Sequence, residues 1–71
     1  MENKIKYLRV LYDLTQDDLA KQVGCTRQTI NAIEKNKYSP SLVLAFRIAE
    51  VLKTDITEVF SYQPSVDHSI K

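Results

Sequence analysis

The sequence predicts an all-α fold, a compact domain of five short helices. Apolar residues recur at spacings of three and four along most of the chain. Residues that favour helix N-termini precede four of these apolar segments, and the segments between them are short, without repeats or long linkers. A chain of 71 residues makes one domain. A domain of this size buries only about 60% of the surface that its unfolded chain exposes, so we expect modest stability.

Composition excludes several classes of protein. The one cysteine, Cys25, cannot form an intrachain disulfide, and no apolar run approaches the ~18 residues of a membrane span. No continuous apolar stretch follows the early lysines, so we do not expect a signal peptide at the start of the sequence. We therefore expect a cytoplasmic protein with no membrane partner. The formal net charge of +1 decides nothing about nucleic acid, because the placement of charges matters more than their sum.

The first helix is expected at about residues 2–11. Its apolar stripe consists of Ile5, Leu8 and Tyr12. Arg9 lies within this stripe. Thr15 caps the second helix, whose first turn carries two aspartates that favour the positive end of the helix dipole. The inner face of the second helix is formed by Leu19, Ala20 and Val23.

A tight turn separates the second helix from the third. Gly24 ends the second helix, since glycine readily adopts the left-handed conformation just past a helix C-terminus. Thr26 then caps a third helix that runs to about Lys35 and turns Ile30 and Ile33 to the core. Two short helices joined in this way bury little themselves, and such a pair usually holds its second helix where it can enter a groove. The segment therefore predicts a helix-turn-helix.

The remaining chain predicts two helices and an extended tail. Ser41 caps the fourth helix, and Asp55 opens a short fifth helix. Their inward residues are Leu42, Ala45, Ile48, Ala49 and Leu52, then Ile56, Val59 and Phe60. From Phe60 to Lys71 the pattern has period two, which predicts either a strand or a disordered terminus, since Pro64 would confine a strand to a sheet edge. A strand would pair with the N-terminal residues or with another subunit.

The outward face of the third helix carries side chains suited to reading DNA bases. Arg27 can donate two hydrogen bonds to guanine O6 and N7, whereas Gln28 and Asn31 can pair with adenine N6 and N7. The alternative is an ordinary solvated helix face, but its place directly after the turn of a helix pair favours DNA contact. We therefore expect a DNA-binding domain at residues 1–60, with the helix-turn-helix at about 15–35. Residues 61–71 form a tail or strand and are a candidate dimerisation element.

Residues around the base-reading row are expected to contact phosphates. Helix N-termini offer free N–H groups, and the loop after the third helix concentrates positive charge. The candidate phosphate-binding residues are Gln16, Thr26, Lys35, Asn36, Lys37 and Tyr38. For the two lysines, the alternative is an ordinary contribution to solubility.

Three other polar residues are interpreted structurally. Glu34 lies at the margin of an apolar stripe and needs a partner, for which Arg9 is the best candidate, so we expect a structural ion pair. Cys25 is interpreted as a small apolar filler of the turn, with a redox switch as the weaker alternative, because only Arg27 is near enough to lower the thiol pKa. His68 has no neighbouring ligands at metal spacing, so neither a metal site nor a cofactor is expected.

Residues 4–60 resemble the Cro/CI-type helix-turn-helix family, also called XRE-like, and most of all its short stand-alone regulators from bacteria and archaea. The matching residues are LTQDDLAKQVGCTRQTINAIEKNKYSPSLVLAFRIAEVL followed by DITEVF. The resemblance implies a lambda-repressor-like fold, with the same base-reading and ion-pair residues as above. It also implies phosphate contacts from Gln16, Thr26 and the loop at residues 36–38. Asn36 departs from the family, where many members have glycine, but asparagine tolerates the left-handed conformation. Ala32 stands where some relatives carry a polar reader, which puts in doubt any contact there beyond methyl packing.

The resemblance also implies a homodimer. Family members of this size commonly act as homodimeric repressors on palindromic operators, with half-sites ~34 Å apart. The sequence supports a dimer independently, because it has more apolar side chains than one core of five short helices needs. The candidate interface residues are Val43, Phe46, Val51 and Tyr62.

The sequence therefore predicts a sequence-specific transcriptional regulator that binds double-stranded DNA, most simply a repressor that occludes a promoter. The alternative is an antitoxin or a phage-type adaptor that uses the same fold to bind another protein. No Ser/His/Asp, Cys/His or carboxylate pair is placed for catalysis, so an enzyme is not expected. Nothing in the sequence indicates a small-molecule ligand.

Overall fold

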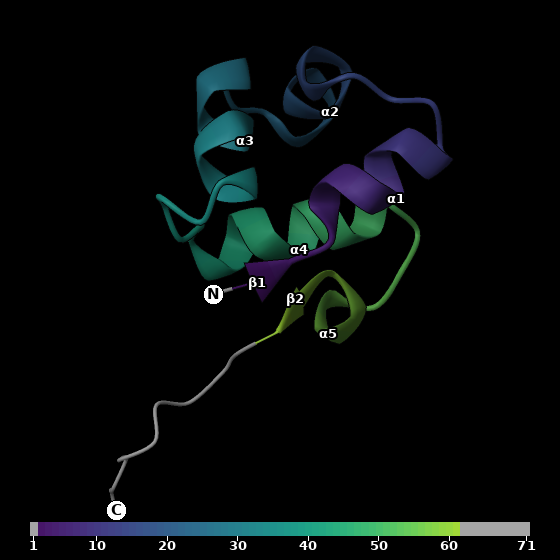
Figure 1. The fold of residues 1–71 in the computed structure, drawn as a ribbon, viewed down its shortest axis with the longest axis vertical. Coiled ribbons are helices and arrows are strands. Elements are labelled where there is room, and N and C mark those ends of the chain that lie inside the picture. The colour runs from purple at the N-terminus through teal and green to yellow at the C-terminus, as the bar shows by residue number, and fades with distance from the viewer. Residues whose placement is uncertain (1, 62–71) are drawn as a thin grey trace, which may run out of the picture.

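A computed structural model, which describes residues 2–61, confirms the predicted all-helical architecture (Figure 1). The helices are α1 (Ile5–Leu11), α2 (Gln16–Val23), α3 (Arg27–Glu34), α4 (Leu42–Val51) and α5 (Ile56–Val59). Two short strands, β1 (Glu2–Asn3) and β2 (Phe60–Ser61), pair antiparallel, with Glu2 opposite Ser61 and Asn3 opposite Phe60. α2 packs against both α3 and α4, while α5 packs against α4. No helix in the described part of the chain is long and apolar enough to cross a membrane.

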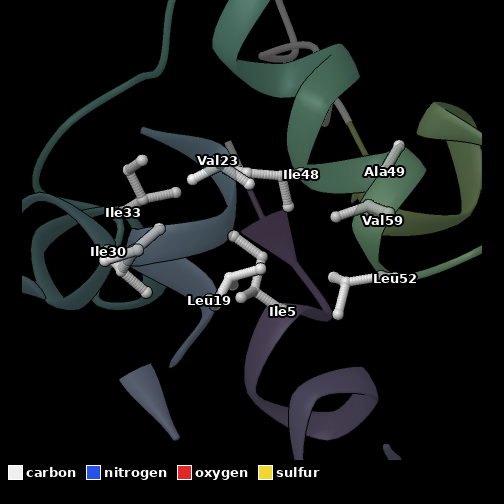
Figure 2. Packing of buried hydrophobic residues seen from close by; sticks show 10 residues of the cluster. Ile5, Leu19, Val23, Ile30, Ile33, Ile48, Ala49, Leu52 and Val59 are labelled. Atoms are coloured by element: carbon white, nitrogen blue, oxygen red, sulfur yellow. The ribbon is translucent and has the colours of Figure 1, made fainter. Parts of the chain in front are cut away.

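The core lies where the inner faces of the five helices meet (Figure 2). Its buried members are Ile5, Leu19, Ala20, Val23, Ile30, Ile33, Ile48, Ala49, Leu52 and Val59. These residues include every inner-face residue predicted for the second and third helices, so that prediction is confirmed. Full burial of a Leu, Ile or Val side chain contributes about 1.5–3 kcal/mol. Because all five helices supply members, the cluster holds the helix-turn-helix to the rest of the chain.

The predicted start of the first helix is wrong. Asn3 belongs to β1, and its side chain is used locally, because Oδ1 accepts the backbone N–H of Ile5 at 3.1 Å. Asn3 Nδ2 also donates to the carbonyl of Ile33 at 2.8 Å. Such side-chain bonds, together with the pairing to β2, compete with a helical start. α1 therefore begins three residues later than expected, at Ile5.

For the first two residues of the C-terminal segment, the structure shows a strand. Residues 60 and 61 form a strand that pairs with the N-terminal residues, one of the two pairings predicted for it. The backbone N–H of Lys4 adds a bond of 2.8 Å to the carbonyl of Val59. The rest of the predicted tail, with Tyr62 and His68, lies outside the described residues.

Two residues predicted in apolar stripes lie outside the core. Leu42 is 68% exposed and Tyr12 is 42% exposed. Leu42 is the first residue of α4 and lies at the edge of the apolar stripe, so its side chain lies beyond the end of the core. Tyr12 follows the last residue of α1, where the chain leaves the helical path that would have turned its ring inward.

All four predicted N-caps are confirmed. The capping side chains belong to Thr15, Thr26, Ser41 and Asp55. At α2 the cap is reciprocal, since Thr15 Oγ1 accepts the N–H of Asp18 at 3.0 Å and Asp18 Oδ2 accepts the N–H of Thr15 at 3.0 Å. A capping box satisfies two N–H groups that the helix itself leaves without partners.

The capping box predicts a pH-dependent part of the stability. The backbone N–H of Thr15, and next its hydroxyl, hold the pKa of Asp18 below its usual value. A depressed carboxyl pKa stabilises the folded state at neutral pH, and this stabilisation is lost as the pH falls through the lowered pKa. We expect Asp18→Asn, which keeps an acceptor but loses the charge, to lower the thermal unfolding temperature at pH 7. The difference from the unmodified protein should shrink below roughly pH 4.

Glu50→Gln is the matched control, because it removes one negative charge from an exposed helical residue outside the capping box. Both variants are compared with the unmodified protein by thermal unfolding across the acid range. A difference for Asp18→Asn that stays constant to the lowest pH at which the protein folds would contradict the prediction.

Candidate nucleic-acid interface

α3 is anchored on one side and open on the other (Figure 1). Ile30 and Ile33 are buried in the core. The three predicted base-reading residues lie elsewhere on the helix, with Arg27 and Gln28 exposed and Asn31 half-buried. The helix therefore presents polar groups to the surroundings while two isoleucines hold it in place.

The turn between α2 and α3 follows the prediction. Gly24 has a φ of 83°, in the left-handed region, and its N–H donates to the carbonyl of Ala20 at 2.9 Å. Cys25 is partly buried and packs against the core, and this burial raises the pKa of its thiol. A raised pKa keeps the thiol protonated and unreactive, which favours the interpretation of Cys25 as a filler. Thr26 Oγ1 then accepts the N–H of Thr29 at 3.2 Å and starts α3.

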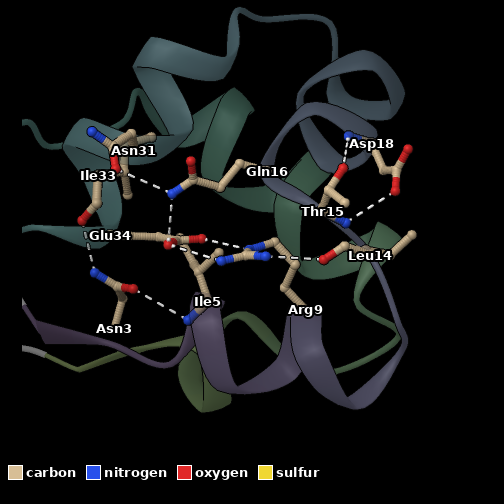
Figure 3. A network of polar contacts seen from close by, with 10 residues as sticks. All are labelled: Asn3, Ile5, Arg9, Leu14, Thr15, Gln16, Asp18, Asn31, Ile33 and Glu34. Carbon is tan, nitrogen blue, oxygen red and sulfur yellow. Dashed lines mark hydrogen bonds and ion pairs between the residues drawn. The ribbon is translucent and has the colours of Figure 1, made fainter.

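The structure contains the ion pair between Arg9 and Glu34 (Figure 3). Arg9 Nε donates to Glu34 Oε2 at 2.8 Å, and Arg9 Nη2 donates to Glu34 Oε1 at 3.3 Å. The two side chains are only 11% and 7% exposed. Arg9 Nη1 also donates to the carbonyl of Leu14 at 3.0 Å. One guanidinium therefore connects α1, the end of the α1–α2 loop and α3.

Gln16 joins this network from α2. Its Nε2 donates to Glu34 Oε1 at 3.1 Å and to Asn31 Oδ1 at 3.1 Å (Figure 3). An amide nitrogen has two hydrogens, so both are used inside the protein. Within the described part of the chain, the backbone N–H of Gln16 donates to no protein group. A phosphate contact by Gln16 would therefore use its backbone N–H at the helix N-terminus.

The loop after α3 is held by Asn36. Its φ of 59° confirms the predicted left-handed conformation, and its Oδ1 accepts a bond of 3.0 Å from Asn3 Nδ2. Lys35, Lys37 and Tyr38 are all exposed beside it. Two cationic side chains and a phenol thus extend the polar side of α3.

Charges of both signs lie near the starts of α2 and α3. An open groove of about 430 Å³ lies between the start of α2 and the start of α3, and Arg27, Asp13 and Asp17 are among its lining residues. Asp17 also pairs with Lys21 at 3.3 Å along α2. Acidic groups at the start of α2 therefore lie beside Arg27, whereas Lys35 and Lys37 follow at the other end of α3. Residues 2–61 contain no cluster of three or more metal-ligating side chains.

Apolar side chains are exposed on α4. Val43 and Phe46, two of the candidate dimer residues, are 62% and 54% exposed. Leu42 lies next to them in the sequence and is also exposed. Val51, a third candidate, is half-buried and packs against the core, so less of its surface is available to a partner. Tyr62, the fourth, lies outside the described residues.

A second apolar surface, on α1, was not predicted. Tyr7, Val10 and Leu11 are each more than 60% exposed, and they line an open groove of about 580 Å³ that also reaches Glu34. Their spacing of three and four residues is a signal that could have revealed this second stripe.

Comparison with known proteins agrees with the geometry. The sequence profile of the helix-turn-helix family matches residues 5–59. An uncharacterized HTH-type transcriptional regulator of Methanocaldococcus jannaschii is 57% identical over 63 residues, which are 89% of this chain and 96% of that protein. The transcriptional repressor RstR of the cryptic phage CTXphi, from Vibrio cholerae, is 33% identical over 97% of this chain and 63% of its own length. The crystal structure of the restriction-modification controller protein C.AhdI from Aeromonas hydrophila has a TM-score of 0.75 at 28% identity, covering 80% of this chain and 83% of that one.

The ion pair predicts a strong asymmetry between single and double substitutions. Arg9→Met leaves the buried Glu34 carboxylate without its cation, which typically costs about 3–5 kcal/mol. The double variant Arg9→Met/Glu34→Leu removes both charges, so it should recover part of that loss, and the remainder reflects the lost bonds to Leu14 and from Gln16. Urea unfolding of the three proteins measures these free energies. A double variant as unstable as the single variant would contradict this account of the pair.

Proposed function

The chain belongs to the helix-turn-helix family, and on this premise we propose that it is a transcriptional regulator that binds double-stranded DNA with α3 in the major groove. The observation that carries the proposal is the polar side of α3, where Arg27 and Gln28 are exposed on a helix held in place by the Arg9–Glu34 ion pair. A helix with its base-reading groups exposed and its orientation fixed is what major-groove recognition requires.

The side chains divide into readers and positioning contacts. Arg27 reads guanine, and Gln28 and Asn31 read the neighbouring bases. Phosphate contacts come from the two helix N-termini and from the loop after α3. The residues in this role are Gln16 through its backbone, Thr26, Lys35, Asn36, Lys37 and Tyr38. This division gives the exposed Lys35 and Lys37 a role beside the readers.

The active form is a homodimer on a palindromic operator, with half-sites about 34 Å apart. The exposed Val43 and Phe46 on α4 support this assembly, because isolated small domains seldom leave such side chains clustered in water. Repression is the simplest mode of action, since a dimer bound across a promoter blocks access to it. The relative named as a phage repressor supports this sign of regulation.

DNA binding should separate the readers from the phosphate contacts. We expect Arg27→Ala to remove most of the discrimination between cognate and random duplexes, by about 1–3 kcal/mol. Lys37→Ala should weaken both duplexes alike and reduce the slope of log affinity against log salt by about 1. A salt titration of both variants on both duplexes measures the effects. Equal losses on cognate and random DNA for Arg27→Ala would contradict its role as a reader.

The dimer surface can be tested with two matched charge insertions. Phe46→Glu places a carboxylate in the α4 surface and should shift the protein to a monomer in sedimentation experiments, with weaker operator binding. Leu11→Glu makes the same kind of change in the exposed apolar surface of α1 and should leave the dimer intact. If Leu11→Glu produces monomers and Phe46→Glu does not, α1 rather than α4 forms the interface.

A further inference from the structure

We propose that Asn3 orients the side chain of Asn36 so that Asn36 donates a hydrogen bond to a DNA phosphate through its Nδ2 atom. Asn3 lies on β1, outside the helix-turn-helix, and is then a positioning residue for DNA binding. The inference rests on the proposed function, because it requires the loop after α3 to lie beside a phosphate.

Two backbone groups set the orientation of the Asn3 amide (Figure 3). Asn3 Oδ1 lies 3.1 Å from the backbone nitrogen of Ile5, which can only donate. Asn3 Nδ2 lies 2.8 Å from the carbonyl of Ile33, which can only accept. Exchanging the two amide atoms would therefore break both bonds. The pairing of Asn3 with Phe60 holds the backbone from which this side chain extends.

The orientation of the Asn36 amide follows from that of Asn3. Asn3 Nδ2 has a second hydrogen, so Asn36 must turn an acceptor toward it, and Asn36 Oδ1 lies 3.0 Å from that nitrogen. The nitrogen of the Asn36 amide lies on the other branch. Within residues 2–61 it donates to no protein group, and Asn36 is exposed. The contact with Asn3 therefore leaves Asn36 with an amino group that is open to a ligand.

This amino group is the part of Asn36 that suits a phosphate. Phosphate oxygens in DNA accept hydrogen bonds, so Asn36 Oδ1 cannot bind them. The backbone N–H of Asn36 donates to the carbonyl of Ile33 at 3.0 Å, and that of Lys37 donates to the carbonyl of Ala32 at 2.9 Å. The end of α3 thus uses these two N–H groups, and the side chains have to supply the donors. Without Asn3, the amide could turn its oxygen outward, where it would repel a phosphate.

A contact by a neutral amide differs from a contact by a lysine in its dependence on salt. A lysine that neutralises a phosphate releases counterions, and each such contact steepens the plot of log affinity against log salt by about 0.9. An amide carries no charge, so its loss should weaken binding without changing this slope. A phosphate contact also carries no sequence information. The expected signature is an equal loss on cognate and random duplexes at an unchanged slope.

The first test removes the Asn36 side chain. Asn36→Gly keeps the backbone, because glycine readily adopts the left-handed conformation that Asn36 has at a φ of 59°. We expect the affinity for cognate and random duplexes to fall alike by roughly 10-fold, as for a hydrogen bond to a charged group, with the slope unchanged. Lys37→Ala provides the contrast in the same salt titration, since it should reduce the slope by about 1.

The second test removes the positioning contact and leaves Asn36 in place. Asn3→Ser retains an oxygen that can accept the N–H of Ile5, but its side chain is too short to reach Asn36. We expect a loss of roughly 3- to 10-fold on both duplexes, because the Asn36 amide must now be ordered on binding. In the double variant, Asn3→Ser should add less than about 2-fold to the loss from Asn36→Gly, because no amide remains to be oriented. Thermal unfolding verifies that each variant is folded under the binding conditions.

The outcomes separate this inference from the function on which it rests. A folded Asn36→Gly variant with the affinity of the unmodified protein would overturn the inference and leave the proposed function standing. Losses of the two single variants that multiply in the double variant would also overturn it. So would a reduced slope for Asn3→Ser, since Asn3 would then position the neighbouring lysines. Selection of no particular sequence by the unmodified protein would instead overturn the proposed function, and the inference with it.

Discussion

The Arg9–Glu34 ion pair is the contact on which the arrangement of the helix-turn-helix depends. Arg9 connects α1 to α3 through Glu34 and reaches the carbonyl of Leu14 before the chain enters α2. Gln16 adds α2 to the same carboxylate. Burying a charge pair is costly in desolvation, and its net contribution to stability is often small. The main contribution of this pair is to fix the orientation of the helices. A guanidinium and a carboxylate can pair in only a few geometries, whereas apolar contacts do not require a particular geometry.

This directional anchoring answers a constraint that DNA recognition places on α3. The side that enters a groove has to remain polar, so the helix has only two fully buried side chains, Ile30 and Ile33, to hold it. Apolar packing of so short a helix leaves its rotation about its own axis weakly determined, yet a small rotation would move Arg27 away from a base edge. Glu34, on the inner margin near the end of α3, opposes such a rotation through its bonds to two other helices.

Features that depend on residues close together in the chain could be predicted from the sequence. Features that depend on how helices and strands lie relative to one another could not. Caps such as Thr15 and the left-handed turn at Gly24 follow from residues a few positions apart, so both were predictable. The partner of Glu34 was predictable because one cation lay on an apolar stripe. The strand at Asn3 was open among alternatives, and the pairing of Gln16 with Asn31 was not predicted, since each depends on distances between elements that no periodicity encodes. The DNA contacts themselves stay predictions, because the described structure contains the protein alone.

The distribution of charge explains how a nearly neutral protein can suit a polyanion. The formal net charge is only +1, but carboxylates at the start of α2 include Asp17, whereas Arg27, Lys35 and Lys37 lie on α3 and the following loop. Because Gln16 donates both amide hydrogens to its neighbours, contacts to phosphates would come from these cations and from backbone N–H groups. In the proposed complex, the polar network would hold α3 in position, while the loop after α3 would attract the phosphates.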